Sequence, residues 1–413
     1  MLRVEEALEV VAKAAGAPRA RREVVPLSDA AGRVLREDVR LDHDVPPFHR
    51  ATMDGFAVRS ADADRSGAEL VVVARVAAGG AFTGRLGPGQ AVAIMTGAPL
   101  PDGADGVIQV EHTQPVAGVA GAETRVRLAH AVAAGANVAR RAEQYARGAV
   151  VVAAGTVVHA GTVGVLAAAG RARVEVAARP RVVVLGTGDE LVPVDAVPGP
   201  AQIRDSNGHA LVAQVARAGG VGEHRGPVRD DEQALRAAVE GALDADLLCL
   251  SGGVSMGDRD LVPSILAACG VEPLFHRWAV KPGGPMWFGR RGDTLVFGLP
   301  GNPAATFVGF ELLAVPAIRT RLGLPFRPRD SMLAVLLGTL PPPIARRQFV
   351  PVTLGVAVDR PMTVATPVRS LGSGDPFALA AASALAVVAE TDAPSRPPEG
   401  FVEVIPLRGG WLG

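Results

Sequence analysis

The chain has little net charge and little aromatic surface. Its 42 basic residues balance 42 acidic ones over 413 residues, so no global field attracts nucleic acid or an anionic membrane. Aromatic residues make up only 4%, with a single tyrosine, which argues against stacking platforms for single-stranded nucleic acid. Any anion that this protein handles must therefore be held by a local site.

Cysteine and lysine are also scarce. The only cysteines, Cys249 and Cys269, lie in apolar stretches, which indicates reduced core thiols of a cytosolic protein rather than a disulfide or a zinc site. The only lysines are Lys13 and Lys281, so 40 of the 42 basic residues are arginine. A lysine is therefore a rare choice in this chain.

No segment is typical of export or of a membrane span. Residues 1–13 show an amphipathic helical pattern that carries Glu5 and Glu6 and lacks the apolar core of a signal peptide. The longest weakly polar stretch, 149–169, is interrupted by His159 and several glycines. We therefore expect a cytoplasmic protein without nucleic-acid or membrane partners.

The pattern along the chain predicts an α/β multidomain protein. Residues 1–40 and 141–178 are expected to form a discontinuous N-terminal domain. The short Val-rich runs of 41–140 predict a small β domain. Residues 179–326 alternate continuous apolar strands with helices, which predicts a doubly wound parallel sheet covered on both faces. Short β runs return in 327–413 and predict a C-terminal β domain.

The first forty residues contain two helical patterns. The second, LSDAAGRVLRED (27–38), begins with Ser28 and Asp29, which are typical of a helix start, and continues with apolar residues at helical spacing. We expect a short helix there.

Three loops of the α/β region directly follow predicted strands. They are LGTGDEL (185–191), LSGGVSMGDRD (250–260) and GLPGNP (298–303). In doubly wound sheets, ligands bind beyond the carboxyl ends of the strands, and glycines let backbone N–H groups approach a phosphate. Carboxylates beside such a loop would repel the phosphate unless a divalent metal lay between them. Mg²⁺ bound by one or two carboxylates and substrate phosphates is the usual arrangement.

Each of these features also has an ordinary structural explanation. A glycine-rich loop can be a tight βα turn, Asp258 can be a helix N-cap, and Asp54-Gly55 can be a hairpin turn. No Walker A lysine motif or Gly-x-Gly-x-x-Gly fingerprint occurs, which disfavours an ordinary NTPase or dinucleotide enzyme. Three such loops in one register favour a ligand site.

Lys281 begins a Lys-Pro-Gly-Gly-Pro segment. Proline stiffens the backbone there, so the ammonium is fixed in position. Because arginine is the default cation of this chain, a lysine at 281 indicates that a compact point charge is needed, as for an oxyanion.

Seven motifs identify a family. In chain order they are ATMDGFAVR, IMTGAPLP, GTGDEL, SGGVSMGD, VKPGGP, GLPGNP and GSGDPFAL. Together they resemble the molybdopterin molybdenumtransferases, the bacterial relatives of the C-terminal domain of gephyrin, over essentially the whole chain. The resemblance implies an elongated four-domain subunit, a homodimer with a shared cleft, and Mg²⁺-dependent conversion of adenylylated molybdopterin and molybdate into molybdenum cofactor and AMP.

The resemblance also implies roles for individual residues. The catalytic residues would be Asp54, Glu190, Asp230, Asp260 and Lys281. The metal ligands would be Glu190, Asp230 and Asp260. The substrate-binding residues would be Thr96, Gly252, Gly253, Ser255, Arg277, Pro282, Asn302 and Ser373.

The chain departs from the family pattern at three positions. Gly284 stands where relatives have a second lysine, and Phe56 stands where they have tyrosine. Pro351 stands where an arginine is expected, which leaves Arg346 or Arg347 as substitutes. These changes leave open how strongly the oxyanion binds and whether molybdate or tungstate is preferred.

Two alternative functions remain at this point. A related enzyme that adenylylates the pterin would have a similar α/β domain, but the additional β domains would then be unexplained. A non-catalytic scaffold of the gephyrin type is the other alternative, and no disordered linker supports it. AMP release from adenylylated molybdopterin with Mg²⁺ and molybdate separates the three.

Overall fold

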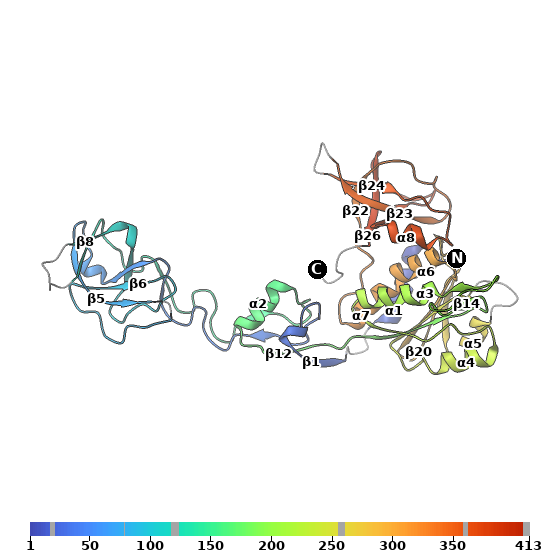
Figure 1. The fold of residues 1–413 in the computed structure, drawn as a ribbon, viewed down its shortest axis with the longest axis horizontal. Coiled ribbons are helices and arrows are strands. Elements are labelled where there is room, and N and C mark those ends of the chain that lie inside the picture. Colours follow the sequence, from blue (N-terminus) through green and yellow to red (C-terminus); the bar gives the residue numbers. More distant parts are fainter. Residues whose placement is uncertain (17–20, 78, 117–123, 255–260, 358–361, 408–413) are drawn as a thin grey trace. The chain divides into compact units, whose positions relative to one another are not determined.

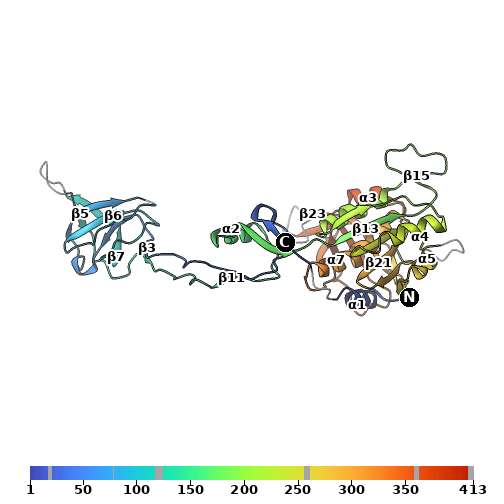
Figure 2. The same cartoon turned by 90° about the horizontal axis from the view of Figure 1, so that it is seen from below.

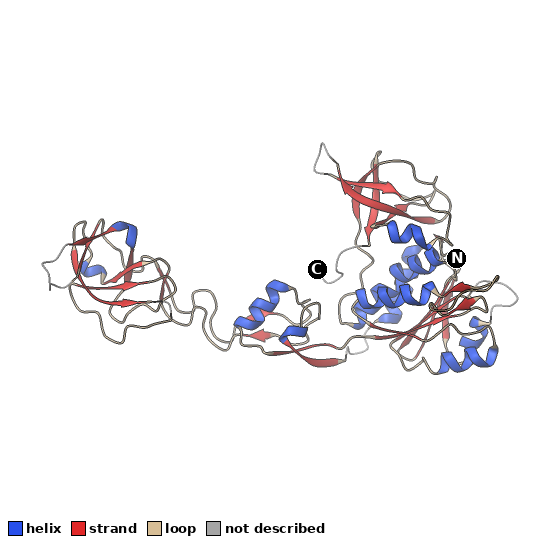
Figure 3. Cartoon of the chain, viewed as in Figure 1, coloured by secondary structure: helices blue, strands red, loops and turns tan. Residues whose placement is uncertain are grey.

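The computed structural model describes the chain except for residues 17–20, 78, 117–123, 255–260, 358–361 and 408–413. The chain forms two compact units. The first comprises Met1–Glu37, Ala154–Val163 and Arg173–Gly413, and the second comprises Asp38–Ala153 and Gly164–Ala172. Helices and strands occur in both (Figures 1 and 3).

The second unit is built on a six-stranded sheet with the order β7-β4-β6-β5-β9-β8. Its strands are β4 (Gly55–Val58), β5 (Glu69–Val76), β6 (Gln90–Ile94), β7 (Gly106–Gln109), β8 (Thr113–Val116) and β9 (Arg125–Leu128). Two short antiparallel pairs accompany it: β3 (Arg50–Ala51) with β10 (Val138–Ala139), and β2 (Val39–Arg40) with β11 (Val150–Val152). A Cβ on Gly55 would lie 1.8 Å from the Ile108 carbonyl oxygen, so only glycine lets β4 pair with β7 after Asp54.

The α/β part of the first unit contains a six-stranded sheet with the order β16-β13-β17-β21-β20-β18. The strands are β13 (Arg181–Gly186), β16 (Val221–His224), β17 (Leu247–Ser251), β18 (Glu272–His276), β20 (Trp287–Arg291) and β21 (Thr294–Leu299). Four neighbouring strands, β16, β13, β17 and β21, are parallel to one another, as predicted. The edge strands β20 and β18 are antiparallel, a feature that the alternating strand and helix pattern did not indicate.

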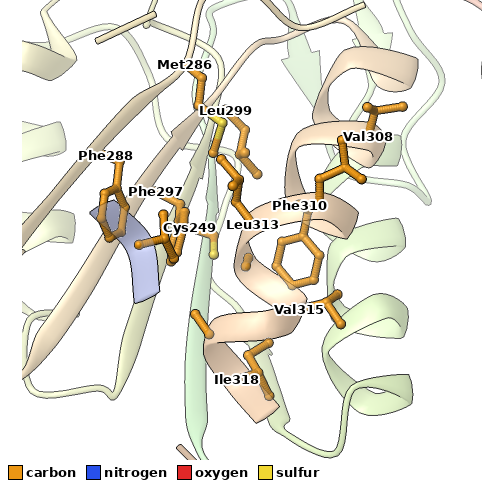
Figure 4. Packing of buried hydrophobic residues seen from close by; sticks show 14 of the residues in the cluster. Cys249, Met286, Phe288, Phe297, Leu299, Val308, Phe310, Leu313, Val315 and Ile318 are labelled. Atoms are coloured by element: carbon orange, nitrogen blue, oxygen red, sulfur yellow. The ribbon is translucent and has the colours of Figure 1, made fainter. Parts of the chain in front are cut away.

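Helices cover both faces of this sheet (Figure 2). They are α3 (Ser206–Arg217), α4 (Glu232–Glu240), α5 (Val262–Ala268) and a continuous run of α6 (Pro303–Gly309), the π-helical η4 (Phe310–Ala314) and α7 (Val315–Arg321). One hydrophobic cluster joins the sheet to α3 and the α6–α7 run, and the other joins it to α4 and α5. Figure 4 shows Leu299 of β21 beside Leu313 of η4, in the same cluster as Phe297 and Phe310. The apolar strands expected between 179 and 326 are therefore buried on both sides.

The first helix, α1 (Val4–Ala15), packs with this α/β core. Val4, Ala7, Val11 and Ala15 are buried in the same cluster as the inner face of the sheet. Their spacing places all four on one face of the helix.

The helix expected over residues 27–38 is absent. Only the 3-10 turn η1 (Leu27–Asp29) forms, and Gly32 then adopts a φ of 77°. Val34 and Leu35 instead make antiparallel bridges to Val157 and Val176. The prediction was wrong because the same apolar residues can also form short bridges after a glycine in the left-handed conformation. Pairing with residues far along the chain favours the bridges over the helix.

The remaining elements of the first unit include β1 (Arg22–Pro26), which pairs antiparallel with β12 (Arg173–Ala177). The short strands β14 (Leu191–Val192) and β15 (Ile203–Arg204) pair in parallel. The helix α2 (Ala160–Ala168) follows β11 along the chain. Within the parts of the chain that the structure describes, no helix is both long and apolar enough to span a bilayer.

A second six-stranded sheet follows, with the order β19-β23-β24-β22-β26-β25. Its elements are β19 (Val280–Lys281), β22 (Met332–Leu336), β23 (Arg347–Val356), β24 (Thr363–Pro367), β25 (Ala384–Val388), β26 (Phe401–Pro406) and the short helix α8 (Pro376–Ala381). β19 comes from the α/β region and pairs in parallel with β23, with Lys281 opposite Gln348. The Lys281 segment therefore belongs to the α/β region in sequence and pairs with the C-terminal sheet.

A buried ionic cluster links two helices of the α/β part to the end of the C-terminal sheet. Glu311 of η4 is fully buried and pairs with Arg217 of α3 and with Arg329, whose Nε lies 2.7 Å from Glu311 Oε1. Arg217 also donates to the carbonyl oxygen of Leu407 at 2.8 Å, and Arg329 donates to that of Pro406. The end of β26 is thus held by two guanidinium groups that share one carboxylate.

Candidate functional site

A cleft of about 1110 Å³ lies at the carboxyl ends of the parallel strands, between them and the C-terminal sheet. The loops after β13, β17 and β21 all contribute to its lining, so the three loops singled out from the sequence meet in space. The opposite wall comes from the segment after β19 and from residues 341–351 and 370–379.

Most of the predicted site residues lie at this cleft. Those that line it are Glu190, Asp230, Gly252, Gly253, Lys281, Pro282, Asn302 and Ser373. Arg277 is exposed just beyond β18 and lies outside the cleft lining. Asp54 and Thr96 belong to the other compact unit. Ser255 and Asp260 fall outside the described residues.

Two glycines close the floor of the cleft after β17. Gly252 has a φ of 103°, and a Cβ there would lie 2.3 Å from the carbonyl oxygen of Thr187. Gly253 has a φ of 64°, and its Cβ would lie 2.7 Å from a Val262 methyl group. Any other residue would be strained at either position. Gly252 is therefore pressed against the loop after β13, and neither glycine extends a side chain into the cleft.

The Thr187 hydroxyl was not singled out from the sequence, although it lies in the GTGDEL motif. Thr187 is 3% exposed, and within the described parts of the chain its Oγ1 has no hydrogen-bond partner. A buried hydroxyl costs free energy when it lacks a partner. Thr187 is thus a buried polar group in the floor of the cleft, without a hydrogen-bond partner among the described residues.

Glu190 and Asp230 reach the cleft from two neighbouring loops. The backbone N–H of Asp230 donates to Asp189 Oδ1 at 3.2 Å, and Gly188 donates to the Val228 carbonyl at 3.2 Å. These bonds hold the loop after β16 beside the loop after β13. The pairing brings two of the three predicted metal ligands to one side of the cleft.

A further polar group, Asn207, was missed by the sequence analysis. Its Nδ2 donates to Ser251 Oγ at 2.9 Å and to the Gly301 carbonyl at 2.7 Å. Asn207 thereby ties the end of β17 to the loop after β21. The available signal was Asp205, an N-cap residue whose Oδ1 accepts from the Gly208 N–H at 2.9 Å and so starts α3 at the cleft edge.

The C-terminal wall is attached through the GLPGNP loop. Asn302 Nδ2 donates to Ser373 Oγ at 3.0 Å, and the Ala304 N–H donates to the Ser373 carbonyl at 3.0 Å. On the neighbouring segment, Trp278 Nε1 donates to the Gly283 carbonyl at 2.7 Å. This bond braces the loop on which the exposed Lys281 lies.

The two arginines that the sequence offered as substitutes have different surroundings. Arg346 lines the cleft. Arg347 pairs with Glu5 at 2.7 Å and with Glu390 at 3.2 Å. Only Arg346 is therefore placed to contact a ligand.

Asp54 and Thr96, from separate motifs, meet in the second unit. Asp54 Oδ1 accepts from the Thr96 backbone N–H and from its hydroxyl, both at 2.7 Å. These hydrogen bonds, the backbone one first, hold the pKa of Asp54 below its ordinary value. Asp54 is therefore a fixed carboxylate at neutral pH.

Comparison with known proteins identifies the family. A family model described as "MoeA N-terminal region (domain I and II)" matches residues 2–170, and one described as "Probable molybdopterin binding domain" matches residues 183–320. The molybdopterin molybdenumtransferase of Bacillus subtilis is 39% identical over 305 residues, which cover 73% of this chain and 70% of that protein. The chain belongs to the molybdopterin molybdenumtransferase family.

Other relatives agree. Molybdopterin molybdenumtransferase 1 of Mycobacterium tuberculosis is 37% identical over 345 residues, covering 78% of this chain and 79% of that protein. Two crystal structures of molybdopterin biosynthesis moeA proteins from Pyrococcus horikoshii superpose with TM-scores of 0.81 and 0.77, at 32% and 28% identity. They cover 99% and 98% of this chain and 100% of each relative. The family resemblance and the multidomain α/β fold predicted from the sequence are confirmed.

The family match divides the cleft. Residues 183–320, which match the molybdopterin-binding model, include Glu190, Asp230 and the loops after β17 and β21. The wall that carries Arg346 and Ser373 lies beyond that match. The cleft of this family member is thus completed by its C-terminal sheet.

Proposed function

We propose that this chain inserts molybdate into adenylylated molybdopterin, with release of AMP, as a step of molybdenum cofactor biosynthesis in the cytoplasm. The observation that carries the proposal is the composition of the cleft in a member of this family. Glycine loops and carboxylates line one side, and Lys281 lies on the other. A substrate with phosphates and an oxyanion requires both kinds of group.

Different residues of the cleft would bind different parts of the substrates. The backbone N–H groups of Gly252 and Gly253 would face the phosphates, because both residues line the cleft and carry no side chain. Asn302 and Ser373 bind polar groups of the substrate at the joint between the two walls. Lys281 holds molybdate as a point charge.

Mg²⁺ fits the carboxylates of this cleft. Glu190 and Asp230 line it together, and Mg²⁺ is commonly bound by one or two carboxylates plus substrate phosphates. Among the residues that the structure describes, no cluster of three His, Cys, Asp or Glu side chains forms a complete metal site, and the third expected ligand, Asp260, lies outside them. When bound, Mg²⁺ would neutralise charge on the phosphates.

A Glu190→Ala variant tests this function. We expect AMP release from adenylylated molybdopterin, Mg²⁺ and molybdate to be lost while the fold stays intact, since Glu190 would hold the metal. Glu272→Ala removes an exposed acid that is not among the residues lining the cleft and should leave AMP release unchanged. If Glu190 were only an acidic residue near a helix start, its loss would change stability by about 0.3–1 kcal/mol and leave turnover normal. Normal turnover by Glu190→Ala would therefore refute the role of Glu190 as a metal ligand.

We further propose a homodimer in which Asp54 and Thr96 serve the partner's cleft. Under this arrangement, inactive Asp54→Ala and Glu190→Ala chains complement each other, because a heterodimer has one site free of both changes. Isolated heterodimers should recover toward half of wild-type AMP release. Heterodimers that stay inactive would assign all these residues to a single subunit's site.

A further inference from the structure

Arg346 is a half-buried cation at the cleft. It lines the cleft, and within the described parts of the chain it makes no ion pair or hydrogen bond. Its neighbour Arg347 is paired with two carboxylates. A guanidinium stays charged at all ordinary pH values, and burying it without an anion costs free energy. The chain keeps at Arg346 a positive charge that its described side chains do not neutralise.

The start of β23 places this charge at the cleft. Arg346 directly precedes β23 and Gln348 lies in it, and both line the cleft, whereas Arg347 between them pairs with Glu5 and Glu390. The Arg347 N–H donates to the Ala279 carbonyl at 2.9 Å, so the start of β23 is aligned with the start of the Lys281 loop.

Gly284 provides the space next to Arg346. A Cβ on Gly284 would lie 3.5 Å from Arg346 Nη1 and 3.3 Å from the Val280 carbonyl oxygen. A longer side chain at 284 would therefore contact the guanidinium directly. Position 284 is where the family resemblance implies a second lysine, and a lysine there would place two cations side by side.

We propose that Arg346 supplies the second cation of the oxyanion site and replaces a lysine at position 284. Lys281 of β19 and Arg346, just before β23, then hold one tetrahedral dianion, the ammonium as a point charge and the guanidinium through a planar pair of donors. This inference rests on the proposed function, because it names a group that binds the molybdate substrate. It also explains how the chain dispenses with cations at both Gly284 and Pro351.

Equilibrium dialysis of molybdate against the full-length protein tests the inference. Arg346→Gln should raise the Kd about 10- to 100-fold, the effect of losing one charge-assisted hydrogen bond. The matched control, Arg347→Gln, removes the same charge one residue away. It should leave the molybdate Kd within about twofold while lowering the unfolding temperature, since it removes one partner of the nearly buried Glu390.

A second variant tests the exchange between the two positions. Adding Gly284→Lys to Arg346→Gln should restore most of the molybdate affinity, because it returns a cation to the same space. Gly284 does not have a positive φ, so the backbone accepts a side chain there. Failure of Gly284→Lys to improve binding in a folded double variant would overturn the exchange.

The dialysis readout is independent of turnover. If the wild type binds molybdate in an Arg346-dependent way but releases no AMP, the proposed function is wrong and the oxyanion site stands. If the wild type releases AMP but Arg346→Gln binds molybdate as tightly as the wild type, Arg346 has no such role and the proposed function stands. A wild type that does not bind molybdate at all would overturn the site.

Discussion

The buried Glu311 cluster should be the most sensitive ionic site of the first unit. Glu311→Gln keeps the side-chain shape and removes the charge that balances Arg217 and Arg329. Burial lowers the pKa of Arg329 to about 10, and attraction to Glu311 opposes that shift. The Arg329 side chain is only 8% exposed, so it cannot turn to water, whereas that of Arg217 is 24% exposed.

Removing one partner from a buried ion pair costs about 3–5 kcal/mol. Because the glutamine can still accept hydrogen bonds and Arg217 can reach solvent, we expect about 3 kcal/mol for Glu311→Gln. Urea unfolding followed by circular dichroism measures this as an earlier transition of the first unit.

The control is Glu272→Gln, which breaks an exposed pair with Arg290 whose Nε and Oε2 atoms are 3.0 Å apart. Both of these side chains are about half exposed, so the change should cost about 0–1 kcal/mol. If both variants unfolded at the same urea concentration as the wild type, the buried carboxylate would not hold the end of β26 as argued.

Two further predictions concern the glycine and carboxylate motifs. Thr96→Val should raise the pKa of Asp54 toward its ordinary value without reaching it, since the hydrogen bond from the backbone N–H of residue 96 remains. NMR titration of the carboxyl carbon measures this pKa, and an unchanged value would contradict the prediction. Because the folded-state pKa of Asp54 lies below the unfolded value, its stabilisation is present at neutral pH and is lost as the pH falls through the lowered pKa. Gly252→Ala should destabilise the protein by more than about 1 kcal/mol, because residue 252 has a positive φ and its Cβ would meet the Thr187 carbonyl oxygen. Gly164→Ala, in open space on α2, should stabilise the protein by about 0.5–1 kcal/mol. Equal shifts of the unfolding temperature in the two variants would refute the distinction.

Local sequence patterns were sufficient for the parallel strands and for the loops that follow them. β17 is a continuous apolar run that ends in Ser-Gly-Gly, so both the strand and the strained turn follow from residue type. Residues 27–38 were misread because the outcome depended on partners more than a hundred residues away, Val157 and Val176. Sequence periodicity contains no information on such pairing.

The choice between Arg346 and Arg347 also needed the structure. Arg347 is the first residue of β23, and Arg346 lies just before it. Which of the two faces the cleft depends on the pairing of β23 with β19 and on the position of Glu5 and Glu390. Neither the strand pairing nor the positions of these glutamates can be derived from the local sequence around Arg346 and Arg347.

The pairing of β19 with β23 has a consequence for the order in which the protein matures on the ribosome. The chain emerges from its N-terminus, so the strands and helices through Arg321 can pack while the rest is still being synthesised. Lys281 obtains its neighbouring strand only when residues 347 and 348 have emerged. A nascent chain that stalls after α7 would already present the glycine loops, yet it would lack the strand that seats its only lysine at the cleft.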